Sequence, residues 1–158
     1  RTFLPVFAVN DAHLSWMMAS VGAGSVLGAL VVAWLGKFDH MGRTLLVVQV
    51  LFGGIIAAFA LLPNSGLSYV LLFLSGTALL MIFSLTNSLV QLAVPDELRG
   101  RVISIYLVAF RGGMPLGSLV SGYFISQYSA PPVIAINALL LSLVAAAFLI
   151  WNQQVREL

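Results

Sequence analysis

Apolar residues fall into five long runs that short polar stretches separate. The runs occupy residues 14–36, 44–62, 67–94, 102–128 and 133–151. A helix of about 20 apolar residues, at 1.5 Å per residue, crosses the ~30 Å hydrocarbon core of a bilayer. The pattern therefore predicts five membrane-spanning helices. The third and fourth runs exceed the bilayer thickness, so we expect them to tilt, kink or protrude.

Composition agrees with a membrane protein and excludes several functions. Only 8% of the residues are charged and 61% are hydrophobic, whereas a soluble domain carries about 25% charged residues. The net charge of +2 is small and the basic residues are scattered, which argues against nucleic-acid binding. No cysteine, metal-ligand cluster, nucleophile constellation or phosphate-cradling loop is present. We therefore expect no enzyme activity, metal or cofactor.

The basic residues predict the orientation in the membrane. When the five spans alternate in direction, one side receives Lys37, Arg43, Arg99, Arg101 and Arg156. The other side holds Arg1 alone. By the positive-inside rule the first side is cytoplasmic, which puts the C-terminus inside and the chain in the inner or plasma membrane. Residues 1–9 are too short to span and read either as the outer end of a preceding span or as an interfacial arm.

The first inner loop, residues 36–43, combines glycine with charge. Gly36 and Gly42 allow a tight reversal, because glycine takes positive φ without steric cost. Asp39 is placed to reach a helix N-terminus or an arginine, where a carboxylate is stabilised. The alternative is a solvated turn whose Arg43 only sets topology.

The second inner loop, residues 95–101, reads as the start of a helix. Proline is tolerated in a first helical turn, and Asp96 and Glu97 suit its positive end. Glu97 and Arg101 are spaced i,i+4, so they can pair on one face of a helix. The alternative is an ordinary capped helix start with arginines that set topology.

Arg111 lies about ten residues into the fourth span. An arginine at a helix centre costs about 2.5–3.5 kcal/mol on the insertion scale, so it needs a partner or water. It either serves a function or snorkels toward the cytoplasmic face. Beyond it, Pro115 is expected to kink the helix, and small residues either permit motion or pack statically: Gly112, Gly113 and Gly117.

A polar stripe follows one face of the third span. Ser84, Asn87 and Gln91 are spaced to share that face. Such a stripe either lines an aqueous cavity or forms hydrogen bonds with neighbouring helices. His13, in the outer loop, is interpreted as solvated rather than proton-coupling.

Together the two inner loops resemble the major facilitator superfamily. The first is similar to the signature Gly-x-x-x-Asp-[Arg/Lys]-x-Gly-Arg, with His40 in place of the usual basic residue. The second, continued to Ser104, is similar to the Pro-x-Glu-x-Arg-Gly-Arg-Val-x-Ser segment before span eleven. That segment is typical of the exporter branch with enterobactin-type siderophore exporters and macrolide efflux proteins. The two spans between the loops agree with the family topology.

The resemblance implies an all-α integral membrane protein and a place within a twelve-span fold. The chain would be the tail of span seven at residues 1–9 plus spans eight to twelve, the C-terminal six-helix half with five complete spans. Its partners would be the lipid bilayer, a small-molecule substrate and the missing N-terminal half. The implied function is ion-gradient-driven efflux, as an antiporter, of small hydrophobic or amphipathic compounds of drug or siderophore type. An importer of the same fold and a non-transporting scaffold or assembly subunit are the alternatives.

The resemblance also assigns roles to residues. Arg111 would contact substrate or a counter-carboxylate, with Ser84, Asn87 and Gln91 lining the cavity. An inner-gate network would comprise Gly36, Asp39, Gly42, Arg43, Asp96, Glu97, Arg99 and Arg101. Helix flexing would use Gly112, Gly113, Pro115 and Gly117. Gln49 and Asn137 lie on spans that the family places toward lipid, so their expected roles are structural.

Overall fold

A computed structural model describes residues 11–36, 39–62 and 65–151, in which the chain forms helices and no strand. The helices are α2 (Asp11–Leu35), α3 (Met41–Leu61), α4 (Ser65–Ala93), α5 (Arg99–Gln127) and α6 (Ala130–Trp151). All five are long and apolar enough to cross a membrane, which confirms an all-α membrane protein. The predicted end of an earlier span, at residues 1–9, lies outside the described residues, as do Lys37 and Arg156.

The helices begin two to three residues before the apolar runs that predicted them. The first turn of a helix has backbone N–H groups without intrahelical acceptors, so it accepts polar residues and proline. Accordingly, α5 starts at Arg99, and α6 starts at Ala130 with Pro131 and Pro132 in its first turn. The apolar pattern therefore marks the part of each helix inside the bilayer and omits its outermost turn.

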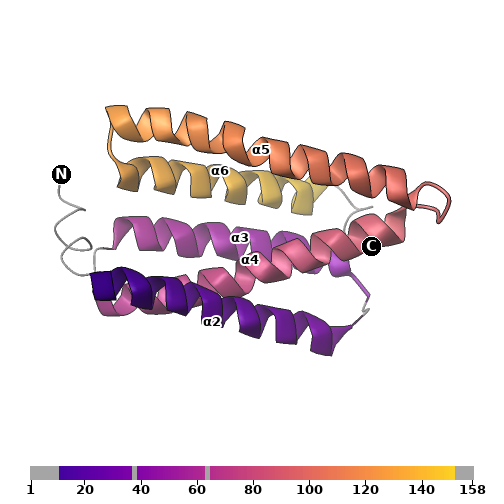
Figure 1. Cartoon of the computed structure of the whole chain (residues 1–158), viewed down its shortest axis with the longest axis horizontal. Coiled ribbons are helices and arrows are strands. Elements are labelled where there is room, and N and C mark those ends of the chain that lie inside the picture. The colour runs from indigo at the N-terminus through magenta and orange to yellow at the C-terminus, as the bar shows by residue number, and fades with distance from the viewer. Residues whose placement is uncertain (1–10, 37–38, 63–64, 152–158) are drawn as a thin grey trace.

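Consecutive helices run antiparallel, so α2 and α4 are parallel to one another and lie side by side (Figure 1). The α3 helix packs against both α4 and α6. The α5 helix lies at the edge of the bundle, with sparse contacts to α6 and α4 and no buried residue. The four helices α2, α3, α4 and α6 therefore form the packed part of the structure, and α5 lies at its edge.

Backbone contact between α2 and α4 depends on glycine. A Cβ atom at Gly24 would overlap the carbonyl oxygen of Phe73, and one at Gly28 would overlap that of Thr77. The Thr77 hydroxyl donates to the Gly24 carbonyl across the interface at 2.9 Å. Gly76 meets the backbone of Val21 in the same way. Without a hydrophobic force between helices in lipid, such close packing and interhelical hydrogen bonds hold the pair together.

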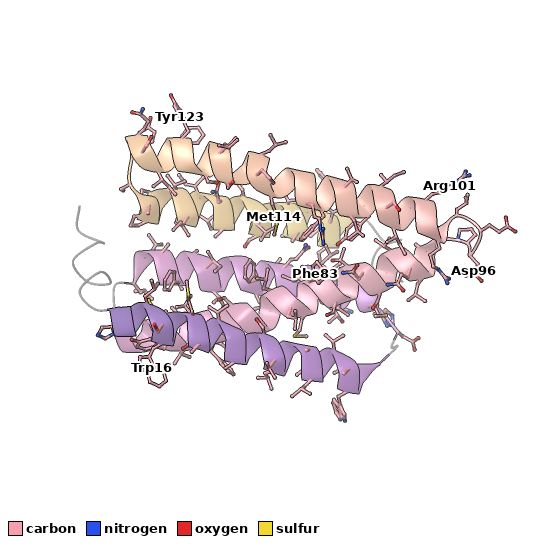
Figure 2. The ribbon with its side chains drawn as sticks, in the orientation of Figure 1. Trp16, Phe83, Asp96, Arg101, Met114 and Tyr123 are labelled. Atoms are coloured by element: carbon pink, nitrogen blue, oxygen red, sulfur yellow. The ribbon has the colours of Figure 1, made fainter. Side chains whose placement is uncertain are left out.

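Exposed aromatic residues mark two levels along the helices. Trp16 is 68% exposed near the start of α2 and Trp34 is 87% exposed near its end. Eighteen residues of helix separate them by about 27 Å, close to the ~30 Å hydrocarbon thickness. Tyr128, after α5, and Trp151, at the end of α6, are equally open. Figure 2 shows Trp16 pointing away from the bundle. Such rings anchor helices at membrane interfaces.

Candidate functional site

The first inner loop reverses direction through two left-handed residues. Gly36 has φ 59° and its N–H bonds to the carbonyl of Val32 at 3.1 Å. His40 has φ 67° and occupies the N-cap position of α3, where its side chain makes no capping hydrogen bond. Gly42 lies inside α3 and is buried, so the prediction that it makes the reversal is wrong, because the helix has already begun at Met41.

Two charged residues of this loop, Asp39 and Arg43, face solvent. Asp39 is exposed in the turn before α3, and Arg43 is exposed in the helix's first turn. Neither side chain bonds to another residue of the described chain in the structure. A contribution of this pair to an inner gate therefore stays a prediction.

The second inner loop is a short turn that precedes α5. The N–H of Leu98 bonds to the carbonyl of Pro95 at 3.0 Å, and α5 starts only at Arg99. Asp96 and Arg99 form an ion pair at 2.5 Å. The Glu97–Arg101 pair that the spacing would allow in a helix does not form, because Glu97 precedes α5 and i,i+4 spacing does not bring the two together there. Figure 2 shows Asp96 and Arg101 on opposite sides of this turn.

A cavity of about 380 Å³ joins the two inner loops. It is lined by Val32, Ala33, Gly36, Met41, Ser88, Gln91, Leu92 and Arg99. Residues from the end of α2, the start of α3, the end of α4 and the start of α5 thus meet at one place. The structure brings Gln91 of the polar stripe together with Gly36 and Arg99, which the two loop motifs had singled out separately.

The rest of the polar stripe has different surroundings. The Asn87 side-chain amide donates to the carbonyl of Phe83 in its own helix at 2.9 Å. Ser84 and Asn87 are both half-buried, whereas Gln91 is exposed to the cavity. The stripe is therefore continuous along α4, but only its inner end opens into a described cavity.

Contacts between α5 and the bundle follow one face of that helix. The rings of Phe83 on α4 and Phe110 on α5 are 5.5 Å apart, and Tyr106 stacks on Phe110 at 6.0 Å. Farther along, the Asn137 amide of α6 donates to the Ser121 hydroxyl at 3.1 Å. Successive helical residues turn by about 100°, so Phe110 and Ser121 share one face. We call this face the contact face of α5.

Arg111 is exposed and lies about a quarter turn from the contact face. None of the described helices covers it. The glycines near it are also uncovered. A Cβ atom at Gly112, Gly113 or Gly117 would meet nothing within 4 Å. Pro115 lies inside α5, which continues through it. The close helix approach that these glycines allow is therefore not made within the described part of the chain.

Two interhelical contacts had no clear signal in the sequence. The His13 ring and the Tyr69 hydroxyl are hydrogen-bonded at 2.7 Å between α2 and α4, so His13 has a partner and is not simply solvated. The Phe83–Phe110 contact joins α4 to α5, and the i,i+4 spacing of Tyr106 and Phe110 indicates only that these two rings share a face of α5. Among the described residues, no group of three or more histidine or acidic side chains could hold a metal.

Comparison with known proteins gives two matches. The family model described as transmembrane secretion effector matches residues 6–158. The multidrug efflux pump Tap of Mycolicibacterium fortuitum is 29% identical over 114 residues, a match that covers 72% of this chain and 28% of Tap. The matched part of the chain thus corresponds to less than a third of that relative's length. No solved structure matches the chain.

Proposed function

Because the chain belongs to the transmembrane secretion effector family of the major facilitator superfamily, we propose that it is part of an exporter of small hydrophobic or amphipathic compounds. The chain is an integral membrane protein whose described residues form five apolar helices. Its similarity to a multidrug efflux pump supports export and a broad range of substrates. Transport by the whole protein would be driven by an ion gradient, as in an antiporter.

The uncovered face of α5 carries this proposal. Arg111 lies on an apolar helix of 29 residues, and no helix of the described chain shields it. A charge in the hydrocarbon core is costly, and such residues face a bundle interior or a water-filled cavity. We propose that the N-terminal half of the same protein faces Arg111 across that cavity. Helices α2–α6 would then be spans eight to twelve.

Individual residues take the following roles in this proposal. Arg111 binds substrate or a counter-carboxylate, and Ser84, Asn87 and Gln91 line the pathway. The cavity at the inner end opens and closes as the loops around it separate and meet. Charges at that end hold one conformation: Asp39, Arg43, Asp96, Glu97, Arg99 and Arg101. The inner end and the C-terminus face the cytoplasm of a cell whose inner or plasma membrane holds the protein.

The test measures efflux of a fluorescent amphipathic dye from cells that produce the full-length protein. Arg111→Ala is expected to lower efflux by more than about tenfold, because a hydrogen bond to a charged group contributes ~1.5–3 kcal/mol. Arg111→Lys, which keeps the charge, retains part of the activity. Ile105→Ala is the matched control, because Ile105 is 70% exposed on a third face of α5. Membrane abundance of each variant is measured in parallel.

Each contrary outcome has a defined meaning. Wild-type efflux by Arg111→Ala contradicts the role of Arg111. Dye accumulation against its gradient, in place of efflux, identifies an importer of the same fold. A wild-type protein whose conformation does not respond to any dye, and that moves none, is a scaffold or assembly subunit.

A further inference from the structure

A second cavity, of about 550 Å³, lies between α5 and α6. It is lined by Val120, Ser121, Phe124, Tyr128, Pro132, Val133, Ile136, Asn137 and Leu140. We call it the α5–α6 groove. Small-molecule sites typically have about 300–1,000 Å³ and apolar walls with a few polar groups. The groove has that size and that composition.

The groove lies inside the membrane, near the end of the bundle where α5 passes into α6. Asn137 is seven residues into α6, or about 10 Å below its first residue. From Pro132 to Leu140 the groove extends about 12 Å along the helix. Ser121 places it on the contact face of α5, a quarter turn from Arg111. The groove is thus separate from the proposed transport pathway.

Two of its polar residues, Ser121 and Asn137, lie toward the deep end, and a third, Tyr128, lies at the surface end. The Asn137 amide offers two donors and a carbonyl acceptor, and one donor is used by Ser121. Within the described chain its other donor and its carbonyl have no protein partner. Water is scarce at this depth, so an unsatisfied amide is costly. An occupant that carries a hydrogen-bonding group removes that cost.

The distribution of polarity selects the occupant. No charged residue lines the groove, so a charged ligand would lose its hydration without compensation. A bilayer lipid has its polar group at the surface and would bring only hydrocarbon to Asn137. A fitting molecule has the reverse arrangement, with a hydrogen-bonding group at depth and an apolar body toward Phe124 and the surface.

We propose that the α5–α6 groove binds a neutral amphipathic molecule dissolved in the bilayer, through a hydroxyl or carbonyl group placed on Asn137. Its apolar body lies against Phe124 and Ile136. This site goes beyond the proposed function, because binding there requires neither Arg111 nor transport.

The experiment uses the full-length protein in liposomes and two photoreactive probes, a long-chain alcohol and the matching alkane. Peptide mapping locates the labelled residues, and excess unlabelled alcohol tests whether labelling is saturable. We expect saturable alcohol labelling of α5 and α6 in the groove. Asn137→Leu should lower it about fivefold, as one net hydrogen bond contributes ~1 kcal/mol, and should leave alkane labelling unchanged.

A second pair of variants tests the shape of the site. Ile136→Trp fills the groove and should abolish saturable labelling. Leu139→Trp is the control, because Leu139 is 54% exposed on α6 and does not line the groove. Equal labelling by alcohol and alkane, insensitive to Asn137→Leu, would mean that lipid tails occupy the groove and would overturn the proposal. So would an absence of saturable labelling. Unchanged labelling of Arg111→Ala keeps this result independent of the transport test.

Discussion

Helices α2 and α5 are both rich in glycine, yet their glycines have opposite surroundings. Gly24 and Gly28 of α2 lie directly on the backbone of α4, so that no side chain would fit there. Gly113 and Gly117 of α5 have the same i,i+4 spacing but meet nothing. The spacing of small residues thus shows where another helix can approach closely. Whether one does depends on which helices are neighbours.

This difference separates a tightly packed pair of helices from a helix with few contacts. The α2–α4 pair is held by backbone contact and an interhelical hydrogen bond from Thr77. The α5 helix has no buried residue and touches the bundle mainly through one aromatic contact and one hydrogen bond. An open glycine-rich face beside Arg111 fits the proposal that α5 lines a pathway shared with the rest of the protein.

The largest effect on stability is expected at Gly24. In Gly24→Ala the new methyl group collides with the Phe73 carbonyl, so α2 and α4 must separate and the bond from Thr77 lengthens. Overpacking of this kind costs about 1–3 kcal/mol. We expect a clearly lower melting temperature of the full-length protein in detergent, measured by circular dichroism.

Two further alanine variants test whether location, and not glycine itself, determines this cost. Gly22 lies on α2 and Gly113 on α5, and a Cβ atom at either would meet nothing within 4 Å. Alanine favours helix over glycine by up to about 1 kcal/mol, so neither variant should destabilise these helices. A loss of stability in Gly22→Ala equal to that in Gly24→Ala would refute the contrast drawn within α2.

A smaller effect is expected at Thr77. Its hydroxyl donates to Gly24 across the interface at 2.9 Å and to Phe73 in its own helix at 3.0 Å. Thr77→Val keeps the shape and removes both bonds, which should cost about 0.6 kcal/mol, the average for interhelical bonds in membranes. Ser118→Ala on α5 is the control, since its hydroxyl bonds only to the carbonyl of Pro115 within that helix. Equal unfolding free energies for the two variants would show that the Thr77 hydroxyl does not stabilise the contact between α2 and α4.

The smallest effect is expected in the connection between α5 and α6. Ser129 has φ 134°, a conformation that residues with a Cβ rarely adopt. Ser129→Gly relieves that strain but raises the conformational entropy of the unfolded chain, and the two effects on stability oppose one another. We expect a net gain of about 0.5 kcal/mol or less. Thermal unfolding of Ser129→Gly beside Ser129→Ala measures it, and a lower melting temperature for the glycine variant would contradict it.

The sequence predicted the helices well, because the bilayer imposes a single length scale on apolar runs. It also identified Gly36 as a residue of positive φ and singled out Arg111 as a charge within an apolar span. These features follow from one segment at a time. Each can be inferred from local composition alone.

Interactions between segments could not be predicted in the same way. The contact of Gly24 with Phe73, the bond of His13 with Tyr69 and the Asn137–Ser121 bond all depend on which helices are neighbours. The Glu97–Arg101 pair does not form for a local reason, because three residues of turn separate Pro95 from the first helical residue. The first turn of a helix carries no apolar signal, so the residue at which α5 begins could not be predicted.

The glycine contacts between α2 and α4 admit a single register. Because the two helices run parallel, a shift of α2 by one turn would place either Ser20 against Phe73 or Val32 against Thr77, where only glycine now fits. Both alternatives put a side chain where two backbones touch. The two helices therefore cannot slide past one another by one turn. Any movement of α2 along the membrane normal also moves α4 and the inner loops that follow the two helices.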